Sequence, residues 1–160
     1  MKRYTLAAVA AFTLACHPIS AHEFKAGDLV IDHPMAFETP KTAMSGGGYL
    51  TIINTGSTPD RLIEVRADFP KVQLHTTEEK DGVFKMMHVE AVEISPGETV
   101  KFAPGGLHVM FMGLNGDPFE VGEEIPATLV FEKAGEVEVV FDVEERNGEA
   151  MDHSKHGTMD

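Results

Sequence analysis

The amino-acid sequence predicts an all-β fold, an antiparallel sandwich of two packed sheets. From Leu29 onward the apolar side chains come in short alternating or β-branched runs, which is the pattern of strands. Gly, Pro, Asn and Asp interrupt these runs roughly every eight to twelve residues, the spacing typical of turns in a sandwich. No helical period of useful length accompanies them.

Ten of these runs are expected to form strands. In chain order they cover residues 28–33, 48–54, 61–66, 72–76, 83–87, 89–94, 99–102, 107–114, 127–132 and 136–143. The segments between them hold natural turn formers, namely Ser45–Gly48, Asn54–Gly56, Lys80–Gly82, Ser95–Gly97, Pro104–Gly106 and Asn115–Pro118. Short turns of this kind favour antiparallel neighbours.

The first residues have the features of a secretory signal peptide. Lys2 and Arg3 precede an apolar run, residues 4–15, and small side chains precede a cleavage point after Ala21. The run is too short for a membrane-spanning helix, which needs about 20 residues, and no later segment comes close. We therefore expect residues 1–21 to be removed, the mature chain to begin at His22, and the protein to be periplasmic.

Cys16 permits a second interpretation of the same segment. It is the only cysteine, and the sequence Thr-Leu-Ala-Cys at residues 13–16 weakly resembles a bacterial lipoprotein cleavage box. Cleavage there would leave Cys16 lipidated at the new amino terminus. Cleavage after Ala21 would instead leave a chain without any thiol, which excludes disulfide and thiolate chemistry.

The rest of the chain is expected to form one domain over residues 22–143 and a mobile tail over residues 144–160. A domain of that size buries a sizeable core without disulfides or oligomerisation, so we expect a monomer. The tail has no branched aliphatic or aromatic side chain to bury. The formal net charge of −13, or −15 without Lys2 and Arg3, argues against nucleic acid as a partner.

Histidine and methionine are concentrated in one part of the sequence. Between residues 75 and 112 lie His75, Met86, Met87, His88, His108, Met110 and Met112. Thioether sulfur is a soft, neutral ligand that suits copper(I), and imidazole binds copper in either oxidation state. Calcium and magnesium require oxygen ligands instead. The donor set therefore indicates copper(I).

Strand geometry predicts which of these side chains meet. Residues two apart in a strand share a face, so His108 and Met110 project together. Met86 follows the turn at Lys80–Gly82 and His75 precedes it, so a hairpin can bring both to one edge. We expect these two imidazoles and two thioethers to form one neutral copper(I) site that needs no proton release near neutral pH.

The spacing of the four residues resembles the signature of the PCuAC-type periplasmic copper chaperones. Ten residues separate His75 from Met86, twenty-one separate Met86 from His108, and one separates His108 from Met110, which matches the family pattern in full. Neighbouring segments agree as well, namely Tyr49–Ile52, Asp60–Leu62, Val72–His75, Asp81–Val83, Pro104–Met110 and Thr128–Glu132. The resemblance spans roughly residues 28–143.

This resemblance implies a cupredoxin-like barrel or sandwich with Greek-key topology and a single exposed copper(I) site made by the four residues. It also implies delivery of copper toward the copper centre of a cytochrome c oxidase, by contact with an oxidase subunit or an accessory thiol protein. One segment departs from the family, which often has Trp-Ala-Arg near its first strand where this chain has Met35-Ala36-Phe37. That departure puts any partner contact made by this stretch in doubt, and Met35 is expected to serve packing.

The other histidines and methionines are secondary candidates. Strand alternation puts Met86 and His88 on one face and Met87 on the other, so a register slip would exchange them. The spacing favours Met86 as the ligand. Met112 shares the face of Met110 and is expected to lie deeper, in the core.

Two terminal segments offer further copper donors. The tail contains Met151, His153, His156 and Met159, which either bind a second copper and assist its transfer or are incidental residues of a solvated acidic tail. After cleavage, His22 would offer an amino group and an imidazole to copper(II). Deleting residues 144–160 and recounting bound copper tests the tail.

The residues favour a binding protein over an enzyme. The sequence contains no nucleophile elbow, His-Glu-x-x-His pair, phosphate loop or thiol pair. An electron-transfer cupredoxin needs a cysteine thiolate beside two histidines, which the mature chain would not have. A copper storage or resistance protein would use the same ligands and stays an alternative. One or two coppers per chain suits transfer, and many would suit storage.

Overall fold

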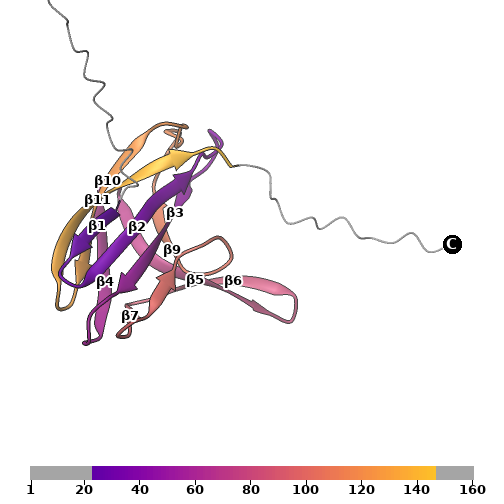
Figure 1. The fold of residues 1–160 in the computed structure, drawn as a ribbon. Coiled ribbons are helices and arrows are strands. Elements are labelled where there is room, and N and C mark those ends of the chain that lie inside the picture. The colour runs from indigo at the N-terminus through magenta and orange to yellow at the C-terminus, as the bar shows by residue number, and fades with distance from the viewer. Residues whose placement is uncertain (1–22, 147–160) are drawn as a thin grey trace, which may run out of the picture.

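The computed structural model describes residues 23–146, which form eleven strands and no helix (Figure 1). The strands are β1 (Glu23–Ala26), β2 (Leu29–Phe37), β3 (Ser45–Asn54), β4 (Asp60–Ala67), β5 (Lys71–Lys80), β6 (Val83–His88), β7 (Val92–Ile94), β8 (Thr99–Lys101), β9 (His108–Met112), β10 (Glu124–Phe131) and β11 (Gly135–Glu144). The predicted all-β fold is confirmed. Each of the ten predicted strands is present with shifted ends, and β1 is the one that the sequence pattern does not predict.

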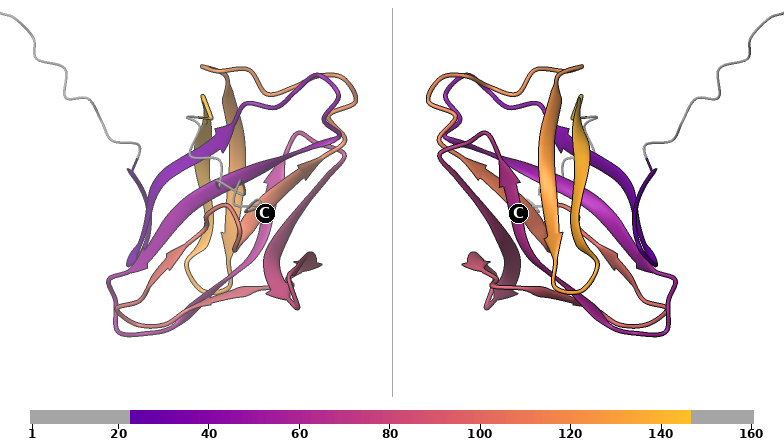
Figure 2. Two further views of the ribbon diagram at one scale, coloured as in Figure 1. Left: turned by 90° about the vertical axis from the view of Figure 1, so that its right-hand side faces the viewer. Right: turned by 90° about the vertical axis from the view of Figure 1, so that its left-hand side faces the viewer.

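The strands form one continuous hydrogen-bonded sheet that bends over onto itself (Figure 2). Its order is β6-β5-β9-β3-β2-β11-β10-β4-β7, with β1 also paired to β2 and β8 also paired to β3. Although distant in this order, β4 and β5 are in contact. All pairings are antiparallel except that of β11 with β2, so the prediction of antiparallel strands throughout fails at this one pair. Among the residues described, no helix could cross a membrane.

The core is filled by the inward-facing side chains of alternating strands. In β3, buried and half-buried residues alternate along the whole strand. The largest buried side chains are aromatic, namely Phe102, Phe111, Phe131 and Phe141. The rings of Phe111 and Phe141 meet edge to face, with their centroids 5.5 Å apart. Aromatic packing of this kind contributes beyond the area it buries, so these rings hold the layers together.

The glycines at the start of β3 serve the core rather than a turn. Ser45–Gly48 is predicted to be a turn but forms the first part of the strand. A Cβ atom on Gly48 would lie 2.7 Å from Cε2 of Phe111 and 3.0 Å from Cε1 of Phe141. The glycines thus leave space for aromatic rings, which explains why a run that is typical of a turn continues as a strand.

A two-residue turn joins β5 to β6 and fixes their register. Asp81 and Gly82 have φ values of 55° and 76°, as in the type I′ turn that suits a two-residue hairpin. The ladder starts with Lys80 opposite Val83. The hairpin projects from the body of the fold, and β6 forms one edge of the sheet (Figure 1). The turn therefore decides which residues of β6 face which residues of β5.

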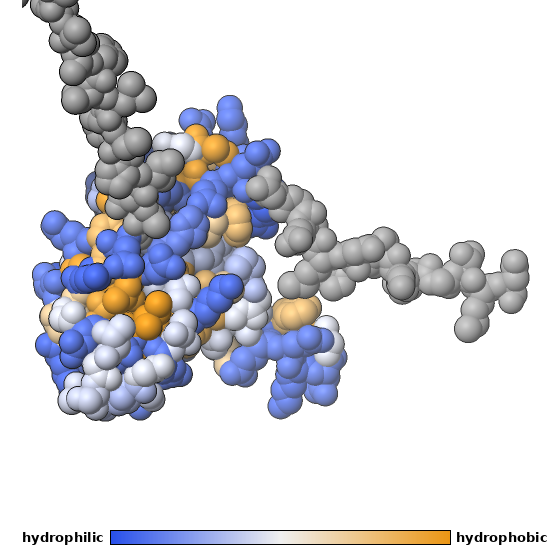
Figure 3. Space-filling view, viewed as in Figure 1, coloured by the Kyte–Doolittle hydropathy of each residue, from blue (hydrophilic) through white to orange (hydrophobic). Residues whose placement is uncertain are grey.

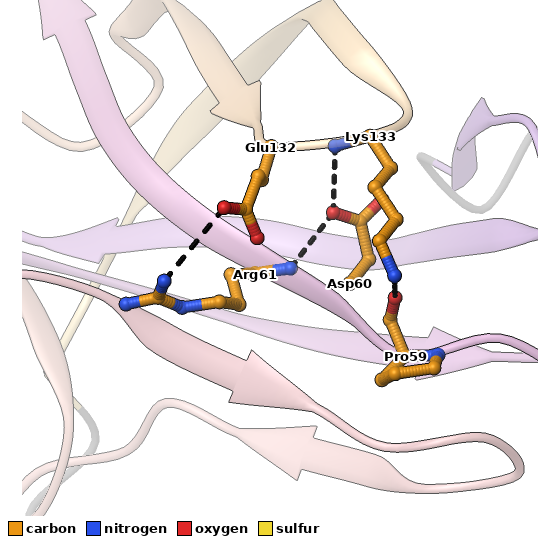
Figure 4. A network of polar contacts seen from close by, with 5 residues as sticks. All are labelled: Pro59, Asp60, Arg61, Glu132 and Lys133. Carbon is orange, nitrogen blue, oxygen red and sulfur yellow. Dashed lines mark hydrogen bonds and ion pairs between the residues drawn. The ribbon is translucent and has the colours of Figure 1, made fainter.

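A buried carboxylate fastens the start of β4 to the turn between β10 and β11 (Figure 4). Asp60 is 6% exposed. It accepts hydrogen bonds from the backbone N–H groups of Arg61 at 2.7 Å, Lys133 at 2.9 Å and Ala134 at 2.9 Å. The Nζ of Lys133 also donates to the carbonyl of Pro59 at 2.6 Å. Both carboxylate oxygens accept hydrogen bonds from backbone N–H groups, so this cluster is structural.

Candidate metal centre

Three neighbouring strands, β6, β5 and β9, carry the predicted copper ligands. β5 lies between the other two and pairs antiparallel with both. The register places His88 of β6 and His108 of β9 directly opposite His75 of β5. Paired residues project to the same side of a sheet, so three imidazoles lie in one row across the strands.

The ring of His75 is almost equally far from both neighbours. Its centroid is 5.8 Å from that of His108 and 5.9 Å from that of His88. Two imidazoles on one metal ion have ring centroids no more than about 6 Å apart, because each ligating nitrogen lies about 2 Å from the metal. Each pair therefore lies within the separation that a shared metal ion allows.

Two ring nitrogens in this row are buried without a hydrogen-bond partner, Nδ1 of His75 and Nε2 of His108. The other nitrogen of each ring is engaged. Nδ1 of His108 donates to the carbonyl of Gly106 at 2.9 Å, and Nε2 of His75 donates to Oε1 of Gln73 at 3.4 Å. An oxygen acceptor requires the proton on those nitrogens, so the unpartnered nitrogens hold the lone pairs that can bind a metal ion.

The surroundings of His75 favour its neutral ring. Burial lowers the pKa of His75, and the neighbouring His108, His88 and Lys71 lower this pKa further. Neutral imidazole is the form that binds a metal. Metal binding at His75 therefore displaces few protons near neutral pH.

The two predicted thioether ligands lie on opposite sides of the histidine row. Met110 is half-buried and occupies the next outward-facing position after His108 in β9. Met86 lies one outward-facing position from His88, toward the hairpin turn, and is 57% exposed. The structure thus brings His75 and His108 side by side on adjacent strands, with Met110 and Met86 each one outward-facing position from the histidine row, on opposite sides of it.

Carboxylates and thiols do not complete a metal site here. Among residues 23–146, no three side chains of His, Cys, Asp or Glu lie close enough together to hold a metal ion. The donors that this face does present are imidazole nitrogen and thioether sulfur. Such a donor set is soft and neutral and suits copper(I).

The other candidates on β6 lie where strand alternation predicts. Met86 and His88 are on the face of His75, and Met87 is opposite Thr76 on the other face. Because the two-residue turn pins the register, no slip exchanges Met86 and Met87 in this structure.

The remaining methionines are placed differently. Met112 is half-buried on the outer face of β9, opposite Lys71, so the prediction that it lies in the core is wrong. The side chains of Val109 and Phe111, which alternate with the methionines, are the ones that pack into the core from that strand. Met35 is opposite Tyr49 on β3 and lines a shallow pocket of about 220 Å³. His22, Met151, His153, His156 and Met159 lie outside the described residues.

Sequence reasoning missed two groups that orient the imidazoles, the amide of Gln73 and the carbonyl of Gly106. Gln73 lies two residues before His75, so strand alternation alone would have placed it on the same face. The Gly106 carbonyl also accepts the N–H of Thr77 at 3.1 Å, which ties the loop before β9 to β5. Nothing in the residue types of this loop indicates that contact.

A hollow elsewhere in the described structure does not resemble a metal site. Its volume is about 670 Å³, and it lies along β4, β10 and β11. Its lining includes Ala67, Ala127 and Val139 and none of the candidate ligands. The candidate ligands lie instead on β5, β6 and β9, where β6 is an edge strand and the projecting end of the β5–β6 hairpin has a mostly hydrophilic surface (Figure 3).

The sequence matches a known family over most of its length. The profile of the family described as putative lipoprotein LpqE-like matches residues 29–143. The putative lipoprotein Lxx21020 of Leifsonia xyli subsp. xyli is 37% identical over 78 residues. That match covers 48% of this chain and 46% of the relative, so the chain spans a little under half of the relative's length.

Solved structures of copper-binding domains have the same fold. The copper-bound PCuAC domain from PmoF2 is 34% identical, covers 78% of this chain and 98% of its own, and superposes with a TM-score of 0.65. The apo PCuAC domain from PmoF1 is 30% identical, with coverage of 78% and 99% and a TM-score of 0.66. The CuI-bound DR1885 of Deinococcus radiodurans is 19% identical, covers 83% and 87%, has a TM-score of 0.54, and shares the fold.

Proposed function

The chain belongs to the LpqE-like family of putative lipoproteins, and from that premise we propose that it is an exported protein that binds copper(I) and delivers it to a partner protein. The observation that carries the proposal is the pair of buried, unpartnered nitrogens of His75 and His108 on adjacent strands. The copper-bound domain from PmoF2, which is 34% identical, supports copper as the cargo.

In this proposal Nδ1 of His75 and Nε2 of His108 bind the ion together with the sulfur of Met110. The sulfur of Met86 completes the set when the hairpin of β5 and β6 bends toward the histidine row. All four donors are neutral, so the complex carries only the charge of the ion, and a monovalent ion is favoured over zinc. Each ring already donates its other N–H group, which fixes the tautomer that the ion needs.

Delivery rather than catalysis follows from where the ligands lie. Copper(I) here is cargo, and although His108 is buried, Met86 is exposed on β6, an edge strand of the sheet. A thioether that is 57% exposed can leave the ion and be replaced by a ligand of an incoming protein. We propose a copper-accepting protein of the oxidase assembly machinery, an oxidase copper domain or an accessory thiol protein, as the recipient.

We propose the cell envelope as the location, with residues 1–21 directing export, residues 22–143 forming the copper-binding domain and residues 144–160 forming a tail. The description of the family and of the Leifsonia relative as putative lipoproteins supports this location. Fractionation and intact mass distinguish the two cleavage sites. A lipidated form beginning at Cys16 would sediment with membranes, and a form beginning at His22 would stay in the soluble periplasmic fraction.

The test is copper(I) affinity in competition with a chromogenic chelator. The His108→Ala variant should lose about 100-fold or more in copper(I) affinity, because a buried ligand is removed, while circular dichroism stays that of a β protein. His33→Ala is the matched control, since His33 is an exposed histidine of β2 that pairs with Glu144. Wild-type affinity in the His108 variant would contradict the proposed site.

A further inference from the structure

A third histidine in the row has no role in the proposed function. His75 has one imidazole on each side at nearly the same centroid distance, 5.8 Å to His108 and 5.9 Å to His88. The four proposed ligands use the first pair only. The second pair has a similar ring separation, and its outer member, His88, lies on an edge strand of the sheet.

The strands that flank β5 carry matching donors. On β9, His108 and Met110 share the outer face, and on β6, Met86 and His88 share it. Each flanking strand therefore offers His75 one imidazole and one thioether. The two sets differ in exposure, because His108 is 6% exposed while His88 and Met86 are both exposed.

The three rings do not form one site. Within residues 23–146 no three imidazole or carboxylate side chains converge on a metal position. A neutral imidazole also has a single unprotonated nitrogen, so His75 can bind only one ion at a time. The geometry thus offers two alternative positions for one ion.

We propose that His88 is a copper ligand that forms an outer copper(I) position with His75 and Met86, next to the inner position of His75, His108 and Met110. This inference rests on the proposed function, because both positions bind the same cargo. Copper passes between the two by exchanging the ligands His108 and Met110 for His88 and Met86, while His75 stays bound. Copper remains in the +1 state throughout.

The outer position gives an ion at the buried inner position a route to the surface. An ion held by His108 cannot be reached directly by a partner, because that ring is buried. His75 can carry the ion to His88, whose strand is the free edge of the sheet. A partner that approaches β6 would then meet an ion with two exposed protein ligands and could displace them one by one.

The first experiment is the rate of copper(I) release from the full chain to excess chromogenic chelator. His88→Ala should keep one tightly bound copper(I), with affinity within about threefold of wild type, and release it about tenfold more slowly. His33→Ala, the exposed histidine control, should release copper at the wild-type rate. A release rate in His88→Ala equal to that of wild type would overturn the relay.

The second experiment removes the inner position. His108→Ala should retain one weakly bound copper(I), and the double variant His88→Ala and His108→Ala should lose it. In proton–nitrogen spectra of the imidazoles, copper(I) should shift the rings of His75 and His88 in the His108 variant. Identical residual binding in the single and double variants, with an unshifted His88 ring, would overturn the outer position alone. A wild-type protein that binds no copper(I) would overturn the proposed function itself.

Discussion

Two buried polar side chains of this domain are equally shielded from water and are built in opposite ways. Asp60 and His108 are each 6% exposed. The oxygens of Asp60 accept three backbone N–H groups at the start of β4 and the turn after β10. His108 has one nitrogen bonded to the Gly106 carbonyl and the other, Nε2, unpartnered. Asp60 therefore stabilises the fold through its hydrogen bonds, whereas His108 has a lone pair with no hydrogen-bond partner.

The contrast separates structural polar groups from functional ones. A buried polar atom without a partner costs about 1–3 kcal/mol, so a fold retains it only where something else satisfies it. Asn54, which is 1% exposed, follows the structural pattern, because its amide donates to the carbonyls of Thr58 and Ile94. The two unpartnered ring nitrogens both lie in the histidine row, where a bound ion would satisfy them.

Among the polar side chains of this comparison, the largest expected effect is on the structural side. Asp60→Ala leaves three backbone N–H groups without their acceptor and should lower the free energy of unfolding by about 3 kcal/mol. Copper(I) binding, measured at a temperature at which the variant is folded, should be unchanged. The hydrogen bonds of Asp60 go to Arg61, Lys133 and Ala134 and not to β5, β6 or β9. Urea denaturation of the apo protein measures the loss, with Asp68→Ala, an exposed carboxylate, as the control. Equal stability of the two variants would show that the cluster is dispensable.

The next largest effect concerns the residue that orients His75. Gln73→Leu removes the acceptor at Nε2 of His75 and should weaken copper(I) binding about tenfold without lowering stability, as is typical of partners that orient a metal ligand. Gln73→Glu keeps an acceptor oxygen at this position and should retain most of the affinity. Chelator competition on both variants decides the point. If both bound copper(I) as wild type does, the Gln73 contact would not orient the ring.

A smaller effect tests whether the unpartnered Nε2 of His108 destabilises the fold. His108→Leu replaces the ring with an apolar side chain of similar burial and should change the free energy of unfolding of the apo protein by no more than about 1 kcal/mol. The Gly106 carbonyl keeps the N–H of Thr77 as a donor. The same variant should lose tight copper(I) binding. Destabilisation as large as that of Asp60→Ala would mean that His108 is a structural residue.

The sequence predicts the parts of this protein that depend on local periodicity. Alternation gives the strands and places His108 with Met110 and Met86 with His88, and the Asp81-Gly82 pair gives the hairpin turn. Prediction from local periodicity fails where contacts between residues far apart in the sequence determine the structure. The glycines before Tyr49 form a strand because aromatic rings occupy their space, and β11 pairs parallel with β2 across more than a hundred residues of chain. No local pattern contains either contact.

The candidate site shows the same division. The identities of the proposed ligands follow from residue types and spacing, whereas their relative placement follows from the register of three strands. That register puts His88 beside His75 and moves Met86 away from Met110, which spacing along the chain cannot indicate. The burial of Nδ1 of His75 and Nε2 of His108 also appears only in the packed structure.

The smallest effect compares an exposed side chain of the hairpin with a buried side chain of the core. Val83 and Phe84 of β6 are 66% and 55% exposed, whereas Phe111 of β9 is fully buried. Phe84→Ser should change the free energy of unfolding by less than about 0.5 kcal/mol, while Phe111→Ala should lower it by about 3–5 kcal/mol. Exposed apolar side chains on a free sheet edge favour association with another chain. A loss above about 1 kcal/mol in Phe84→Ser would indicate instead that the hairpin packs against the body of the domain in solution, closing Met86 over the histidine row before any copper binds.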